Sequence, residues 1–469
     1  MRSIRHGAAI TAIAAVLAGC AIPASKPMLA PLPGSALGLS DTAAPLIATD
    51  WWASFGDPQL DRLVADAIAG NPSLDAALAR VRQADALLST QRANSGPDLA
   101  LDSQEQVARL SGRYTIPPPY AGTVRAVGTT QLTLNWNLDL FGRQKAAIDG
   151  ARASTLAAGL DVAAARLALS GAVVQTYINL SRAETQAVIA RRTIATRQDS
   201  LRLDNVRIRN KLASALDAQG AVTLVAQAEQ ALLRAQAAQV LARNALAALA
   251  GRGSDYAANV RPTALTLDAA LPLPSAVPAD LISRRADIAA AQARIAAAAA
   301  GRQVARKAFY PNVNLAALGG FQALGIGNLF SLDAGTVGAG PAVHLPIFDN
   351  GRLKAGLEGA TAGLDLAIAS YNGTVVGAVR EAADALTRIR SLSDDRARQA
   401  EVVRGLAETG RLNTIRVSSG LESRLGLVDN DVRLLDAQQS DANLAADAAS
   451  QRVALVLALG GGFDPKDPK

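Results

Sequence analysis

Residues 132–140 read LTLNWNLDL, so apolar and polar side chains alternate at every position. A period of two is typical of a β-strand with one apolar and one polar face. The polar face carries Asn135, Asn137 and Asp139, and the apolar face carries Trp136 near its end. Lipid on one side and a water-filled lumen on the other require this distribution. The stretch predicts a strand of a transmembrane barrel, with a hairpin on a small soluble sheet as the alternative.

Three more segments alternate in a similar way. A weaker partner covers residues 99–107, across a loop with three consecutive prolines, and two others lie near residues 313–321 and 343–347. We therefore predict one hairpin at about 98–140 and a second at about 312–347, with strands of the ~10-residue length that crosses a membrane.

Four strands are too few for a barrel, and an open sheet edge does not persist in lipid. Two chains would give eight strands and a lumen filled by side chains, whereas three would give twelve strands and room for a channel. The sequence thus predicts an oligomer and leaves the number of chains open.

Two long windows contain no proline, from Pro119 to Pro262 and from Pro346 to Pro465. Both are rich in helix-forming residues, and proline is the main residue that breaks helices. A helix from Gly142 to about Lys211 would be ~105 Å long. The helices expected near 61–95 and 212–250 are each about half as long, so each half of the chain forms two columns of similar height.

The two windows belong to an internal duplication. At an offset of 214, and of 209 further along, arginines, prolines and glycines recur at matching positions. The pairs are Arg92 and Arg306, Pro97 and Pro311, Gly142 and Gly351, Arg143 and Arg352, and Gly251 and Gly460. Such constant offsets indicate a tandem repeat of one ~200-residue unit.

The amino terminus predicts the destination of the protein. Residues 1–5 are basic, and residues 8–17 form an apolar run that is too short to cross a bilayer, which takes ~20 residues. The run ends in LAGC, whose last residue, Cys20, is the chain's only cysteine. This resembles the lipobox of bacterial lipoproteins, and Ala21 resembles an outer-membrane sorting signal. We expect Cys20 to carry the lipid.

The composition leaves little scope for catalysis. The single cysteine excludes an internal disulfide, and His344 is the one histidine outside the predicted signal peptide. Metal sites and Ser-His or Cys-His catalysis are therefore disfavoured, and we expect neither an enzyme nor a cofactor. The net charge of +7 is spread along the helices without a dense basic arm, so we expect no nucleic-acid partner. Residues 460–462 lack the context of a phosphate-binding loop and are interpreted as a helix end.

These features divide the chain into six parts. They are a signal peptide (1–19), a lipid-anchored extended tether without packed structure (20–50), a first repeat (51–261), a proline-rich crossing (262–279), a second repeat (280–463) and a C-terminal tail (464–469).

Several motifs together resemble those of TolC-like outer-membrane efflux proteins. They are LDLFGR at 138–143, RADI at 285–288, FYP at 309–311, PIFDNGR at 346–352 and ALGGG at 458–462. With the lipobox, the chain most resembles the NodT-type lipoproteins of resistance-nodulation-division pumps. The resemblance implies a mainly α-helical fold with four strands per chain, a twelve-stranded trimeric barrel and a long α-helical tunnel through the periplasm.

The resemblance also implies a function. A lipid-anchored homotrimer in the lipid of the outer membrane would be a passive duct for drugs or other small toxic molecules. A periplasmic adaptor, or membrane fusion protein, would join it to an inner-membrane pump of the resistance-nodulation-division type. The exit duct of a type I secretion system and a lipid-anchored helical scaffold are the alternatives.

Two sets of site residues follow from the resemblance. The helical tips that dock the adaptor correspond to Leu212 and Ser214 in the first repeat, and to Gly420, Leu421 and Ser423 in the second. A tip with small and apolar side chains allows close approach between helices.

The second set would close the tunnel at its periplasmic end. Leu425 and Asp429 lie four residues apart and therefore on one helix face, where the family's constriction resembles a ring of Leu and a ring of Asp. We expect Asp431 and Arg433 to hold the closed state through ion pairs. The first-repeat counterpart of Asp429 is Gly220, so the second repeat alone supplies the carboxylate.

Overall fold

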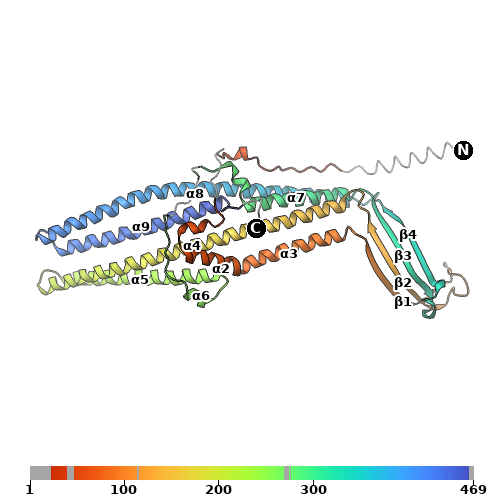
Figure 1. Cartoon of the computed structure of the whole chain (residues 1–469), viewed down its shortest axis with the longest axis horizontal. Coiled ribbons are helices and arrows are strands. Elements are labelled where there is room, and N and C mark those ends of the chain that lie inside the picture. The colour runs from red at the N-terminus through yellow and green to blue at the C-terminus, as the bar shows by residue number, and fades with distance from the viewer. Residues whose placement is uncertain (1–22, 40–46, 114–115, 269–273, 275, 464–469) are drawn as a thin grey trace. The chain divides into compact units, whose positions relative to one another are not determined.

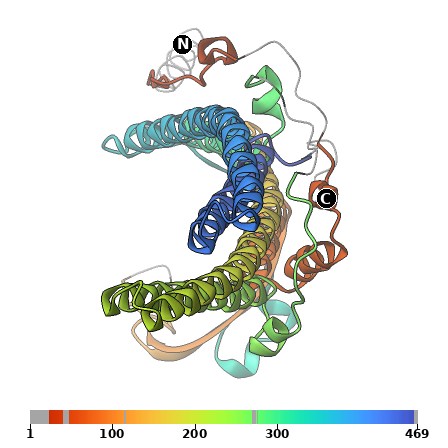
Figure 2. The same cartoon turned by 90° about the vertical axis from the view of Figure 1, so that its left-hand side faces the viewer.

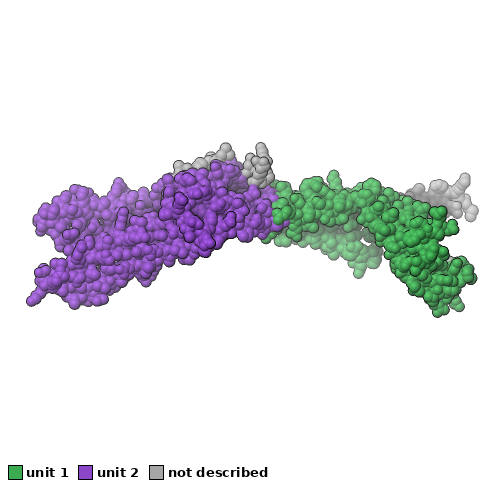
Figure 3. Space-filling model, turned by 60° about the horizontal axis from the view of Figure 1, so that its bottom comes forward, with its two compact units in different colours: residues 1–31, 80–158, 291–371 green, residues 32–79, 159–290, 372–469 purple. Residues whose placement is uncertain are grey.

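The computed structural model describes residues 23–39, 47–113, 116–268, 274 and 276–463. The chain forms two compact units, which Figure 3 shows in green and purple. The strand unit holds residues 1–31, 80–158 and 291–371, and the helical unit holds residues 32–79, 159–290 and 372–469. Each unit takes segments from both sequence repeats. The predicted signal peptide, Cys20 and the tail 464–469 lie outside the described residues.

Four antiparallel strands form one sheet in the strand unit, in the order β1-β2-β3-β4 (Figure 1). They are β1 (Asp98–Arg109), β2 (Val124–Asn137), β3 (Asn312–Leu324) and β4 (Gly335–His344). Each repeat contributes one hairpin, and the hairpins pair through β2 and β3. The edges β1 and β4 each have one strand partner among the described residues.

The strand register separates apolar from polar side chains. Residues directly opposite each other in an antiparallel pair lie on the same face of the sheet. Leu99 lies opposite Leu134 on one face, and Asn137 lies opposite Asn314 on the other. Exposed side chains on the apolar face are those of Leu101, Val107, Leu132, Val337 and Val343. The alternation in the sequence therefore gives the sheet an uncovered apolar face, as a membrane strand requires.

The junction from sheet to helix is built twice by the same residue types. The two long helices are α4 (Arg143–Arg209) and α8 (Arg352–Ser418), each of 67 residues. Asp139 and Asp349 each accept two hydrogen bonds, at 2.8–3.1 Å, from backbone N–H groups at the start of these helices. The preceding Gly142 and Gly351 have φ values of 72° and 82°, which favour glycine. The repeated Asp and Gly-Arg positions are therefore helix-start signals.

Shorter helices accompany the two long ones. They are α2 (Pro58–Gly70), α3 (Pro72–Ala93), α5 (Ala215–Leu249), α6 (Ser254–Ala258), α7 (Ala286–Lys307) and α9 (Arg424–Ala458). Short 3-10 helices cover Gly34–Leu37, Trp51–Phe55, Ala279–Ser283, Ile326–Asn328 and Leu332–Ala334. In the helical unit, α5 returns beside α4 and α9 returns beside α8, so each repeat ends in one helical hairpin (Figures 1 and 2).

Alanine lets the helices of the first hairpin approach closely. Ala221, Ala228, Ala235 and Ala242 on α5 are all buried and recur at every seventh position. A seven-residue spacing keeps these small side chains along one seam between two helices. The larger side chains of the helical unit, including Trp51, Phe55 and Tyr177, form a core cluster where α2 and α4 meet.

Two matching glycines end the returning helices. Gly251 follows α5 with a φ of 66°, and Gly460 follows α9 with a φ of 93°. A Cβ atom would lie 1.9 Å from the carbonyl oxygen of Gly70 in the first case and 2.0 Å from that of Arg284 in the second. Both sites thus need glycine for conformation and for space, and both are helix ends.

The described part of the N-terminal tether departs from the expectation of no packed structure. The backbone N–H groups of Met28 and Leu29 both donate to Asp365 on α8, at 3.0 Å. The hydroxyl of Ser25 donates to Thr361, at 2.8 Å. Because these bonds join segments more than 330 residues apart, the tether is extended but docked on α8.

Candidate tunnel tips, aperture and bracing network

The two hairpin tips have the same backbone turn. Lys211 and Gly420 both adopt the left-handed conformation, with φ values of 57° and 70°. The next backbone N–H, at Leu212 or Leu421, donates to a carbonyl oxygen five residues earlier, at 2.8 Å in both tips. This is the Schellman end of a helix, in which glycine is usual. The first tip therefore places a lysine in a conformation that costs a side chain more than it costs glycine.

Serine starts the returning helix at both tips. The N–H and hydroxyl of Ser214 both lie 2.8 Å from a carboxylate oxygen of Asp217. The hydroxyl of Ser423 accepts a hydrogen bond from the N–H of Gly426 at 3.3 Å. Glycine and serine thus shape the turn, while Leu212 and Leu421 are 70% and 71% exposed. The structure brings the predicted tip residues together within each tip, with a leucine on the surface.

The predicted aperture residues lie in the first three turns of α9. Leu425 and Asp431 are half-buried, whereas Asp429 and Arg433 are exposed. Burial raises the pKa of Asp431 above its ordinary value. Within the described part of this chain, Asp431 and Arg433 take part in no ion pair.

One buried polar contact next to the aperture was not predicted from the sequence. Asn430 on α9 is 6% exposed and donates its side-chain amide to the carbonyl oxygen of Leu406 on α8, at 3.1 Å. At the same offset of 209, the first repeat has the buried Ala221. The comparison of the repeats could have identified Asn430, because a polar residue stands where the other hairpin has an apolar one.

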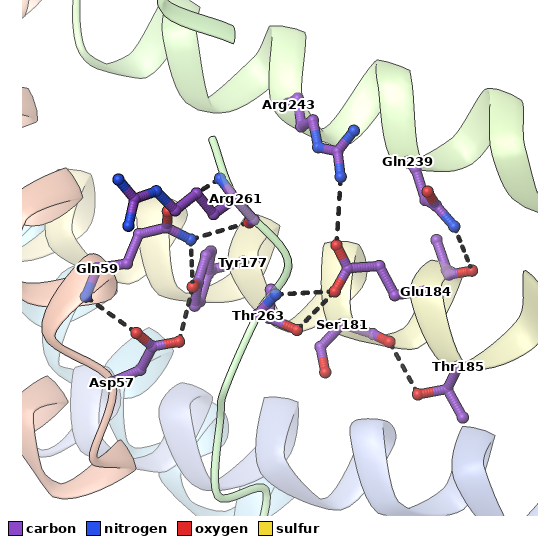
Figure 4. A network of polar contacts seen from close by, with 11 residues as sticks. Asp57, Gln59, Tyr177, Ser181, Glu184, Thr185, Gln239, Arg243, Arg261 and Thr263 are labelled. Atoms are coloured by element: carbon purple, nitrogen blue, oxygen red, sulfur yellow. Dashed lines mark hydrogen bonds and ion pairs between the residues drawn. The ribbon is translucent and has the colours of Figure 1, made fainter. Parts of the chain in front are cut away.

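A polar network braces the helical unit (Figure 4). Asp57 accepts hydrogen bonds from the hydroxyl of Tyr177 at 2.7 Å and from the N–H of Ala264 at 2.8 Å. Burial raises the pKa of Asp57, but these two hydrogen bonds together with those from the N–H groups of Gln59 and Leu60 outweigh burial, and the net pKa is lowered. Burial and the neighbouring carboxylate both raise the pKa of Tyr177. Asp57 is therefore an ionised anchor for the chain near Ala264.

A second carboxylate holds the same stretch to α4. Glu184 accepts hydrogen bonds from the N–H and the hydroxyl of Thr263, at 2.9 and 2.8 Å (Figure 4). Its other oxygen forms an ion pair of 3.4 Å with Arg243 of α5. Glu184 thus joins α4, α5 and the residues after α6. Sequence reasoning missed these partners, since 79 residues separate Thr263 from Glu184.

A family model described as outer membrane efflux protein matches residues 63–252 and 277–461. These two matches cover most of the chain and fall one in each repeat. The chain belongs to the outer membrane efflux protein family. The resemblance inferred from the junction motifs is therefore confirmed.

Individual relatives agree with the family assignment. The efflux protein is 35% identical to outer membrane protein OprJ of Pseudomonas aeruginosa, over 99% of this chain and 97% of that protein. It is also 35% identical to the fusaric acid resistance protein FusA of Burkholderia cepacia, over 76% of this chain and 69% of that protein. Among solved structures, outer membrane protein VceC of Vibrio cholerae matches with a TM-score of 0.82 and 32% identity, covering 89% of this chain and all of VceC.

The family and the fold establish the general role. This efflux protein is the outer-membrane duct of a tripartite efflux system, with a helical tunnel in the periplasm and four strands that contribute to a β-barrel. Family members form trimeric outer-membrane channels that work with adaptors and inner-membrane pumps. The family and fold are those of channel proteins. These findings favour the duct over the helical scaffold.

Proposed function

We propose that three copies of this efflux protein close one twelve-stranded barrel and one helical tunnel. The observation that carries the proposal is the four-stranded sheet, which has an uncovered apolar face and two edges, β1 and β4. Backbone groups at such edges need partners in lipid, and β4 of one copy can supply them to β1 of the next. Twelve strands leave room for a lumen lined by the polar face.

The proposal includes an inner-membrane pump of the resistance-nodulation-division type and a periplasmic adaptor. The exposed Leu212 and Leu421 support docking at the tips, because each offers an apolar side chain beside a turn that lets another helix approach. The cargo would be drugs or other small toxic molecules, as the name of the fusaric acid resistance relative indicates for that protein.

The lipid anchor and the aperture complete the proposal. Cys20 would carry the lipid, and the docked tether from Ser25 to Leu29 would keep that anchor beside the strand unit. Leu425 would form an apolar constriction at the periplasmic end of the tunnel, and Asp429 would form a ring of carboxylates beside it. The exposed position of Asp429 on α9 supports its contact with water.

Native mass spectrometry and single-channel recording test the assembly. The purified protein in detergent should have the mass of three chains, and in a planar bilayer it should give discrete conductance steps. Prior heat dissociation of the complex should abolish both signals together. A monomer that conducts, or a trimer that does not, would contradict the proposed closure of one barrel by three chains.

A further inference from the structure

The stretch from Arg261 to Asp268, which we name the strap, is fixed at both ends within the helical unit. Its first half is bonded to the first repeat: Thr263 binds Glu184 of α4, and Ala264 binds Asp57. Figure 4 shows this end of the strap. The backbone there can move away from α4 only if these charge-assisted bonds break.

The second half of the strap is bonded to the second repeat. Asp268 accepts two hydrogen bonds from the guanidinium of Arg396 on α8, at 2.6 and 3.2 Å. Arg452 on α9 donates to the carbonyl oxygen of Leu267 at 3.0 Å. Arg396 lowers the pKa of Asp268, so the carboxylate is ionised at neutral pH. The strap is therefore a short length of chain that is hydrogen-bonded to both helical hairpins.

The reach of the strap limits the separation of the hairpins. From Thr263 to Asp268 the chain spans at most ~18 Å when fully extended, at ~3.6 Å per residue. The hairpins also touch directly nearby, where Arg182 pairs with Asp447 and Gln186 bonds to Asn443. In the described residues nearer the tips, no hydrogen bond or ion pair joins one hairpin to the other. The polar contacts between the hairpins are thus gathered at the level of the strap.

The length of α8 beyond the strap amplifies any small rotation of this helix. From Arg396 the helix continues to Ser418, which is ~33 Å at 1.5 Å per residue. A rotation of about 5° at the level of the strap would move the tip by about 3 Å over that length. Small slack in the strap therefore becomes a large displacement at the hairpin tip.

We propose that the strap sets the separation of the two hairpin tips and so limits how far the tunnel opens, with Glu184 and Asp268 as the positioning residues. The link to tunnel opening rests on the proposed function, whereas the separation of the tips does not. Each end keeps a second bond when one carboxylate is lost, from Ala264 to Asp57 or from Leu267 to Arg452, so either loss loosens the strap without releasing it. Slack at the two ends adds along the strap, so loss of both carboxylates should have a larger effect than loss of one.

The separation can be measured inside a single chain. Spin labels at Leu212→Cys and Leu421→Cys, in a Cys20→Ser background, report the distance between tips when labelled chains are diluted with unlabelled ones. We expect Asp268→Asn and Glu184→Ala each to broaden this distance and to shift its mean by about 3 Å or more. Thr263→Val is a milder change at the first anchor and should shift the distance in the same direction.

Two matched controls distinguish an effect of the strap from a general loosening of the helical unit. Glu401→Gln removes the exposed ion pair with Arg398 on the same helix and should leave the distance unchanged. Arg243→Ala breaks the bond of Glu184 to α5 but keeps both bonds to Thr263, so it should also leave the distance unchanged. Thermal unfolding of each variant shows whether the helical unit is intact.

The double variant tests whether both ends of the strap control the same distance between the tips. Glu184→Ala with Asp268→Asn should shift the distance by more than either single variant, because slack at the two ends adds. A wild-type distance in the double variant would overturn the proposal. Single-channel recording is the separate test of tunnel opening: a shifted tip distance with wild-type conductance would leave the strap as a positioning element and contradict its role in opening.

Discussion

Asn430 on α9 lies opposite Gly410 on α8, where an added Cβ atom would come within 2.8 Å of the side-chain nitrogen of Asn430. Gly410 leaves space for the amide of Asn430, which donates to the carbonyl oxygen of Leu406, also on α8. The first hairpin has Ala221 and Leu201 at the matching positions, so only the second hairpin pairs its helices here through a buried hydrogen bond. A buried Asn between two helices fixes their register at some cost in stability.

Gly410→Ala should displace Asn430 and break this bond. Gly405→Ala is the matched control, because nothing lies within 4 Å of a Cβ atom at that glycine. Both changes gain helix propensity, but the first leaves a buried amide without its partner, so Gly410→Ala should be less stable than Gly405→Ala by about 1–3 kcal/mol. Thermal or denaturant unfolding of the trimer measures the difference. Equal stabilities would show that the glycine has no packing role.

The tips should bind the adaptor through their leucines. Leu421→Asp places a charge on the exposed end of the second hairpin, and burying it against a partner would cost free energy without a compensating ion. We expect at least a tenfold loss of adaptor affinity, about 1.4 kcal/mol, with the trimer intact. Cross-linking from Ser214→Cys or Ser423→Cys and a direct binding assay measure the effect. Glu408→Gln, which removes an exposed ion pair with Arg411, should bind normally; an adaptor that binds both variants equally docks elsewhere.

Local sequence predicted the parts of the fold that depend on near neighbours. The strands follow from alternation around Trp136, and the start of α4 follows from Asp139, which caps residues five and six positions later. The strap could not be predicted in this way, because Asp268 meets Arg396 across 128 residues. The docking of Met28 on Asp365, across 337 residues, escaped prediction for the same reason. A single sequence carries no signal for such pairs unless a repeat offset shows them, as it does for Asn430.

Cys20→Ser should prevent lipidation while the barrel still assembles. The apolar face of the sheet inserts by itself, and the bonds of Met28 and Leu29 to Asp365 hold the tether without a lipid. We expect accumulation of an unprocessed precursor with its signal peptide, no incorporation of labelled palmitate, and a trimer of normal thermal stability. Asp365→Ala is the converse variant, with a lipidated tether that loses the bonds of Met28 and Leu29 but keeps the bond of Ser25 to Thr361. Normal mature mass and unchanged lipid labelling of Cys20→Ser would refute the assignment.

Asp431 should make the tip of the second hairpin sensitive to pH. Burial raises its pKa in the folded state. The folded protein therefore holds this proton more tightly than the unfolded chain. The free energy of unfolding falls as pH rises through the folded pKa of Asp431. Below the ordinary value of 3.8 the proton is bound in both states, and this loss of stability is absent. Asp431→Asn should accordingly stabilise the protein at neutral pH, by about 1 kcal/mol or less because the group is partly exposed.

Thermal unfolding of the wild type and Asp431→Asn across the acidic and neutral range measures this difference, which should shrink on acidification. Asp429→Asn, at an exposed position of the same helix, is the matched control and should change stability little. A benefit of Asp431→Asn that is independent of pH would assign the effect to packing rather than to charge.

Leu425 and Asp429 should close the tunnel at rest. They lie one helical turn apart on α9, so three copies would give an apolar ring and a carboxylate ring at neighbouring levels. Leu425→Ala with Asp429→Ala should widen the constriction and raise the resting conductance in a planar bilayer by about an order of magnitude. Asp429→Ala alone should chiefly reduce the preference for cations, since it removes the charge and keeps the apolar ring.

The first hairpin supplies the control for this experiment. Leu216, the counterpart of Leu425 at the offset of 209, is 80% exposed and has Gly220 in place of the carboxylate. If the second hairpin alone forms the constriction, Leu216→Ala should leave the resting conductance at the wild-type value. Cells that carry the Leu425→Ala and Asp429→Ala protein should also become sensitive to large antibiotics, which the closed duct excludes. Wild-type conductance in that double variant, or an equal rise in Leu216→Ala, would place the constriction at other residues.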